Sequence, residues 1–163
     1  MSTHSPPRAP EPAPIYTSLR DQILSLVPAE AGIVPLPKAP HIWGVLTEMG
    51  FPNGSATLVA LADGTTSMYF SGGGGIIGCG QHAAVAAAAQ ALVGATADHL
   101  EVLSPTTTFP LPTAGRVQFY VLTLAGARTA EADQQELAAG RHALSDLFRY
   151  SDDLVTQVRR HSQ

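Results

Sequence analysis

A glycine-rich segment between a hydroxyl-rich run and an alanine-rich run is the feature that most constrains the fold of this chain. Six of the nine residues in the range 72–80 are glycine, and Cys79, the only cysteine, lies among them. Residues 65–71 alternate between apolar and hydroxyl side chains, which is typical of a half-buried strand. The alanine-rich run that begins at Gln81 predicts a helix. The chain is therefore expected to cross from a strand to a helix here.

Three more strands are predicted by the pattern of apolar residues. Residues 41–49 and 55–62 favour two strands before the crossing, and Asp63-Gly64 is a two-residue hairpin signal that joins the second of them to residues 65–71. Residues 116–124 form a fourth strand, because apolar side chains recur there at every second position. The first three strands make a meander.

Helices are predicted on both sides of these strands. Residues 15–27 have apolar side chains at helical spacing, and Pro28 ends the run. A second helix is expected over residues 81–103. A last helical region is expected to be capped by Thr129, and Ser151 is a candidate cap for a separate final helix.

These elements predict one α+β domain over residues 15–163, an antiparallel sheet packed by helices, behind a disordered proline-rich tail at residues 1–14. The order of the elements resembles that of profilin-like and roadblock-type domains, which are platforms for a ligand or a partner. The resemblance implies a three-layer arrangement.

The run D-G-T-T-S-M-Y-F-S-G-G-G-G-I-I-G is similar at residue level to a family of small bacterial proteins of no assigned function. The similarity covers residues 57–83 and extends weakly to residues 141–159. It implies a bacterial, cytoplasmic protein and brings no catalytic residues with it.

The charge and the cysteine content exclude several classes of protein. The net charge is −4 and the nine basic residues are scattered, which argues against a nucleic-acid groove. A single cysteine cannot form an internal disulfide, so a disulfide scaffold is excluded. No signal peptide and no apolar run long enough for a membrane span are recognised. We expect a soluble protein of the cytoplasm with no membrane partner.

A ligand site is the first functional interpretation of the glycine segment. Gly73-x-Gly75-x-x-Gly78 has the spacing of a dinucleotide fingerprint, and N–H groups at the start of a helix attract anions. A dinucleotide fold also needs a buried parallel strand before the loop, whereas residues 65–71 are half polar. The prediction is therefore a partner or a small anionic ligand, bound by the hydroxyl side chains that precede the glycines and by the glycine backbone: Tyr69, Ser71, Gly73, Gly74, Gly75, Gly78 and Gly80.

A cysteine nucleophile is the second interpretation. Cys79 lies at the expected helix start, where the helix dipole lowers a thiol pKa, and His82 follows within one turn as a base. The alternative is that Cys79 fills space where two backbones are crowded, as free cysteines usually do.

The interpretation with the most support is structural. Glycine allows one backbone to lie against another, and Ile76 and Ile77 within the run are expected to be buried. The histidine spacings predict no metal site, and no cofactor is expected. We therefore expect a non-enzymatic binding platform centred on the glycine-rich crossing, in a homodimer, with the cysteine-dependent enzyme as the alternative.

Overall fold

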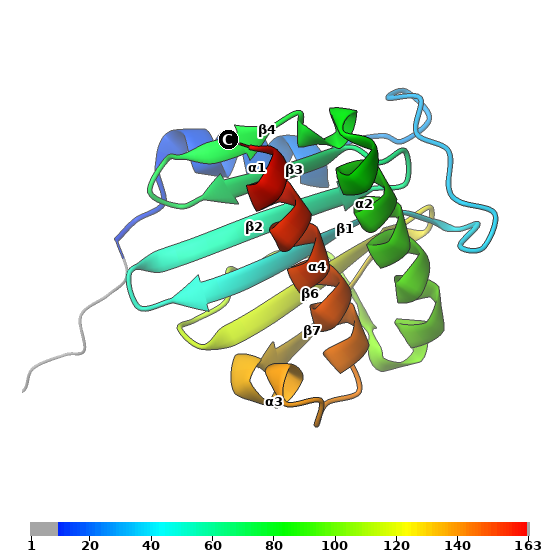
Figure 1. The fold of residues 1–163 in the computed structure, drawn as a ribbon. Coiled ribbons are helices and arrows are strands. Elements are labelled where there is room, and N and C mark those ends of the chain that lie inside the picture. Colours follow the sequence, from blue (N-terminus) through cyan, green and yellow to red (C-terminus); the bar gives the residue numbers. More distant parts are fainter. Residues whose placement is uncertain (1–9, 163) are drawn as a thin grey trace, which may run out of the picture.

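The computed structural model describes residues 10–162, which form helices packed on one antiparallel sheet (Figure 1). The helices are α1 Pro14–Leu24, α2 Ala83–Ala95, α3 Gln134–Ala138 and α4 Ser145–His161, and 3₁₀ turns cover Cys79–Gln81 and Thr96–Val102. The strands are β1 Ile42–Phe51, β2 Gly54–Leu61, β3 Thr66–Phe70, β4 Gly75–Ile77, β5 Ser104–Thr106, β6 Arg116–Thr123 and β7 Gly126–Asp133. The predicted α+β class is confirmed.

The seven strands follow the order β4-β3-β2-β1-β6-β7-β5, and every neighbouring pair is antiparallel. The predicted meander is β1-β2-β3, and the predicted fourth strand, β6, lies beside β1. β4 and β5 form the two edges of the sheet.

Alternation along β1 shows that helices cover both faces of the sheet. Thr47 faces α4, where its hydroxyl lies 2.8 Å from that of Ser151. The next residue, Glu48, faces the other way and binds Arg20 of α1 at 2.7 Å. The molecule thus has three layers, with α2 and α4 on one face and α1 on the other (Figure 1).

A fully buried carboxylate anchors α1. Glu48 is 0% exposed and receives two hydrogen bonds from Arg20, at 2.7 and 2.8 Å, and one from the Thr57 hydroxyl. Arg20 also donates to the carbonyl oxygen of Phe109 and lies over the ring of Tyr120. Burial, and next the charge of Glu48, raise the pKa of Tyr120 to about 12. This ion pair joins α1 to the sheet together with the buried Tyr16 and the partly buried Leu19, Ile23 and Leu24.

The sequence analysis did not predict β4, β5 or β7, and its prediction that Thr129 caps a helix was wrong. Thr129 does not cap a helix, because it lies in β7 opposite Tyr120. β7 reads GARTAEAD and contains the helix-favouring residues alanine and glutamate, so pairing with β6 overrides the local preference. β4 and β5 have three residues each, too few for a periodic pattern.

Other element boundaries also differ from the prediction. The helix expected over residues 81–103 is α2 followed by a 3₁₀ turn. Ser151 does not start a new helix, since its hydroxyl donates to the carbonyl of Leu147 inside α4. The predicted turn at Asp63-Gly64 exists, with Gly64 at a positive φ of 92°, and β3 begins at Thr66 rather than at residue 65.

The proline-rich start is only partly described. Pro14 is the first residue of α1, a position that suits proline because its missing N–H has no helical partner there. The N–H of Ala13 donates to the carbonyl of Ser71, so this segment touches the glycine-rich region. The expectation of disorder for residues 1–9 falls outside the described residues.

Candidate functional site

The glycine-rich segment forms a packed corner at one edge of the sheet. After the turn at residues 71–74, β4 runs antiparallel to β3. Gly78 has φ of 76°, a left-handed conformation that glycine adopts without strain, and it reverses the chain into the 3₁₀ turn. A Cβ at Gly80 would lie 2.5 Å from the carbonyl oxygen of Gly64, because the two backbones touch here. The corner has the close backbone packing expected of a structural crossing.

The corner does not have the architecture of a dinucleotide site. The Gly73-x-Gly75-x-x-Gly78 spacing lies on an antiparallel edge strand and its flanks, not between a parallel strand and a helix. The glycine pattern therefore reflects the turn and the backbone contact.

The two side chains predicted to bind a ligand are turned inward. Tyr69 is 4% exposed and pairs with Thr57 on the sheet face that α1 covers. Ser71 accepts a hydrogen bond at 2.8 Å from the N–H of Ser55. Of the other predicted residues, Gly73, Gly74, Gly75 and Gly78 lie at the surface, and Gly80 is half-buried.

Cys79 occupies a buried position. Its Sγ donates to the carbonyl oxygen of Thr66 at 3.2 Å, and 6% of the residue is exposed. Burial is the main cause that raises the pKa of the Cys79 thiol, the opposite of the depression expected at a helix start. These properties are those of a packing cysteine.

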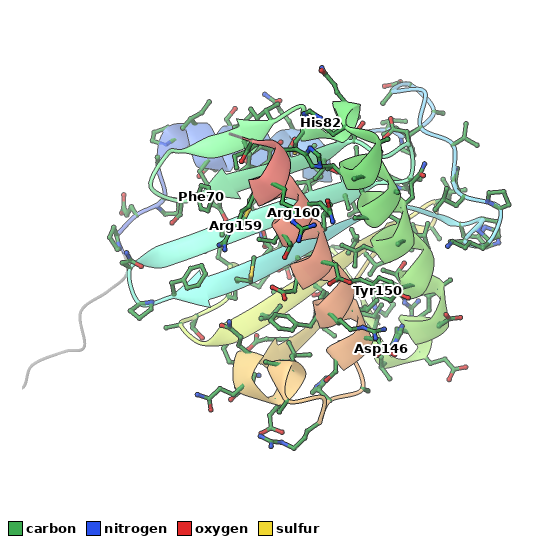
Figure 2. The ribbon with its side chains drawn as sticks, in the orientation of Figure 1. Phe70, His82, Asp146, Tyr150, Arg159 and Arg160 are labelled. Carbon is green, nitrogen blue, oxygen red and sulfur yellow. The ribbon has the colours of Figure 1, made fainter. Side chains whose placement is uncertain are left out.

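His82 lies at the surface, whereas the thiol of Cys79 is buried and donates to a backbone carbonyl. The ring of His82 stacks on that of His161, with centroids 4.6 Å apart. Figure 2 shows His82 close to the end of α4, where Arg159 and Arg160 project. Neither arginine has an ion-pair partner within residues 10–162. We call His82, Arg159, Arg160 and His161 the basic corner.

The outer edge of β4 is open next to the basic corner. Phe70 N donates to Gly74 O, so Gly74 and Ile76 turn their backbone groups toward β3, and Gly75 and Ile77 turn theirs outward. Ile77 is 65% exposed, against the expectation of burial, because no described strand pairs with this side of β4. The sequence offered one signal for the basic corner, the adjacent arginines at the end of an amphipathic run.

We expect Cys79 to react slowly with iodoacetamide in the native protein. Because only the thiolate reacts, a raised pKa and a buried Sγ both lower the rate at neutral pH relative to a free thiol of pKa about 8.5. The rate should rise with pH and jump on unfolding in guanidinium chloride, while His82→Ala leaves the native rate unchanged. Fast alkylation at pH about 6–7 that slows in His82→Ala would instead support a catalytic cysteine.

Within residues 10–162, no group of three or more His, Cys, Asp or Glu side chains is placed to hold a metal ion. None of the described helices is long and apolar enough to cross a membrane. Comparisons with protein-family models, with curated proteins and with solved structures find no match to this chain. The resemblances inferred from the sequence stay predictions.

Proposed function

We propose that this protein is a non-enzymatic platform that binds an extended segment of a partner protein along the open edge of β4. The main support for this proposal is the open edge itself. The backbone groups of Gly75 and Ile77 point outward, and no described strand pairs with them. An extended segment placed here adds a strand to the sheet and satisfies those groups.

The composition of the corner supports strand addition. Proteins commonly protect an edge strand by keeping it short or with charges, proline or a bulge. β4 is short, with three residues, but residues 71–81 contain no charged residue and no proline. The exposed Ile77 gives an added strand an apolar contact. The burial of Cys79 supports a platform over the cysteine-dependent enzyme.

The basic corner indicates the chemistry of the partner. Arg159 and Arg160 belong to the last turn of α4, at the end that lies close to His82 (Figure 2), and have no ion-pair partner among the described residues. Acidic side chains on one face of a strand added to β4 would be attracted to these charges. The partner is therefore an extended segment rich in Asp and Glu. A small anionic ligand, expected from the glycines, would use the same charges.

The wider setting of the proposal comes from the sequence. The resemblance to profilin-like and roadblock-type domains, which act as partner platforms, agrees with it. We keep the expectations of a bacterial, cytoplasmic protein and of a homodimer as part of this proposal. A second copy paired through β4 would bring two basic corners together, which favours an acidic partner for this edge.

The test uses three fluorescent peptides in which valine alternates with glutamate, glutamine or lysine, followed by fluorescence anisotropy. The glutamate peptide should bind most tightly, and added salt should lower its affinity because salt screens the charges. Ile77→Pro removes an outward N–H without touching the bonds to β3, so it should abolish binding in a folded protein. Reversing both charges with Arg159→Glu and Arg160→Glu should lower the affinity about tenfold.

The matched control is Arg149→Glu, an exposed charge reversal on the first half of α4. It should leave binding unchanged. Equal binding of the three peptides, or equal loss in Arg149→Glu, would contradict the acidic partner. A dimer by sedimentation that Ile77→Pro dissociates would identify a second copy as the occupant instead.

A further inference from the structure

We propose a second binding site, for an uncharged and largely apolar small molecule, in a cavity that shares no lining residue with the glycine-rich corner. The cavity has a volume of about 800 Å³ and lies between the coil that follows α1 and the adjoining ends of β1, β6 and β7. That volume is within the range of small-molecule sites, about 300–1,000 Å³. Nothing in the proposed partner function requires it.

Apolar side chains from four separate segments line this cavity. Leu24 and Ile33 come from the end of α1 and the coil after it, Trp43 from β1, Phe109 from the coil after β5, and Leu122 from β6. Leu122 lies on the sheet face that α1 covers, two residues from Tyr120, which touches Arg20. The end of the sheet around Leu122 therefore forms one wall of the cavity.

Among the described residues, no Asp, Glu, Lys, Arg or His lines the cavity. The polar side chains there are mostly engaged within the protein: the Thr123 hydroxyl donates to Gly126 O, the Thr106 hydroxyl donates to Thr108 O, and the Trp43 indole N–H donates to Thr123 O. Arg20, which reaches the carbonyl of Phe109 at the wall, is neutralised by Glu48. The walls offer apolar contact and no counter-ion.

The mouth of the cavity exposes apolar surface that the fold leaves in water. Of the eight large apolar side chains exposed in the described part of the chain, three line this one cavity: Val27 at 49%, Val34 at 75% and Leu124 at 57%. Contiguous exposed apolar surface of this kind marks a binding site more often than scattered single residues do.

These observations select the class of ligand by charge. A carboxylate or ammonium group placed in this cavity would lose its water without gaining an opposite charge, which is costly. A neutral molecule such as a long-chain alcohol has a smaller desolvation cost and gains free energy by burying its apolar surface. The site should therefore prefer an uncharged ligand to its ionised analogue.

The test exploits Trp43, the only tryptophan in the chain. N-phenylnaphthylamine is an uncharged apolar dye that accepts energy from tryptophan, and anilinonaphthalene sulfonate is its anionic relative. The neutral dye should bind one per chain, quench Trp43 and bind about tenfold more tightly than the sulfonate. Dodecanol should displace it at a lower concentration than dodecanoate.

Two matched variants locate the dye. Leu124→Glu places a charge at the mouth on an exposed residue, and should weaken dye binding about tenfold. Val102→Glu makes the same change at a residue 47% exposed but outside the cavity, and should leave binding unchanged. Ala127→Phe fills the cavity without a charge and should also weaken binding, and thermal melts confirm that each variant is folded.

Three results would overturn this site. One is equal dye affinity in Leu124→Glu and Val102→Glu, and another is preference for the sulfonate or for dodecanoate. The third is self-association of the protein at higher concentration, accompanied by a loss of dye binding. That result would show that a second copy of the chain covers the apolar mouth. Ile77→Pro should leave dye binding unchanged. The peptide experiment therefore tests the β4 proposal, and the dye experiment tests this cavity independently of it.

Discussion

Replacing Arg20 with alanine should lower the free energy of unfolding by about 3–5 kcal/mol, the usual cost of leaving a buried charge without its partner. Glu48 is 0% exposed, and both of its carboxylate oxygens accept hydrogen bonds from Arg20. Removal of the guanidinium leaves the Thr57 hydroxyl as the remaining donor to Glu48 among the described residues. The loss should appear as a lower urea midpoint with an unchanged slope in circular dichroism.

The matched control for Arg20→Ala is Arg141→Ala. Arg141 also makes two hydrogen bonds to one carboxylate, that of Glu136, but the two side chains are 63% and 47% exposed. Its removal should cost less than about 1 kcal/mol, because water replaces the lost partner. A similar cost for both variants would show that Glu48 reaches water and that burial does not determine the strength of the pair.

The double variant Arg20→Met with Glu48→Leu should recover much of the stability that Arg20→Ala loses. Apolar side chains of similar size remove the unpaired charge and fill the space, a replacement that is often neutral or stabilising. Because Arg20 also binds Phe109 O, we expect α1 and the coil around Phe109 to exchange amide hydrogens faster in Arg20→Ala.

Replacing Gly80 with alanine should destabilise the protein by about 1–3 kcal/mol, the usual cost of forcing extra atoms into a packed region. The added Cβ would lie 2.5 Å from Gly64 O and 3.1 Å from the Thr66 N atom, so the β2–β3 turn or the corner must move. Backbone atoms cannot yield as a flexible side chain would. Thermal and urea unfolding measure the difference.

Gly72 provides the comparison within the same run of glycines. A Cβ at Gly72 meets nothing within 4 Å, and its φ is not in the left-handed region. Gly72→Ala should therefore be neutral or stabilise by up to about 1 kcal/mol, because alanine restricts the unfolded chain. If Gly80→Ala were as well tolerated as Gly72→Ala, the corner would be an open loop, and its backbone N–H groups would again be candidates for an anion cradle.

Local sequence patterns were sufficient for the elements that carry a clear period. The alternation in residues 116–124 and the Asp63-Gly64 signal located β6 and the β2–β3 connection, whereas the last helical region was predicted without the correct bounds of α4. Such patterns can be recognised within one segment, because the residues that face the core recur at a fixed spacing along a strand or a helix.

The functional surfaces were visible only in part. Residues 72–80 predicted the position of the corner and close backbone packing there, and the structure shows that Gly80 makes this contact. They did not show that Cys79 is buried or that Ile77 is exposed, because both depend on which strands lie beside them. The sheet ends at β4, a property of the whole strand order.

The sequence by itself determined the α+β class, the antiparallel meander and the glycine corner, since these follow from spacing within a few residues. Only the tertiary structure decided the rest. It placed His161 against His82 and Arg20 against Glu48, and it gathered Trp43, Phe109 and Leu122 around one cavity. These groups are brought together by the packing of segments distant in the chain, and no local pattern encodes which distant segments will meet.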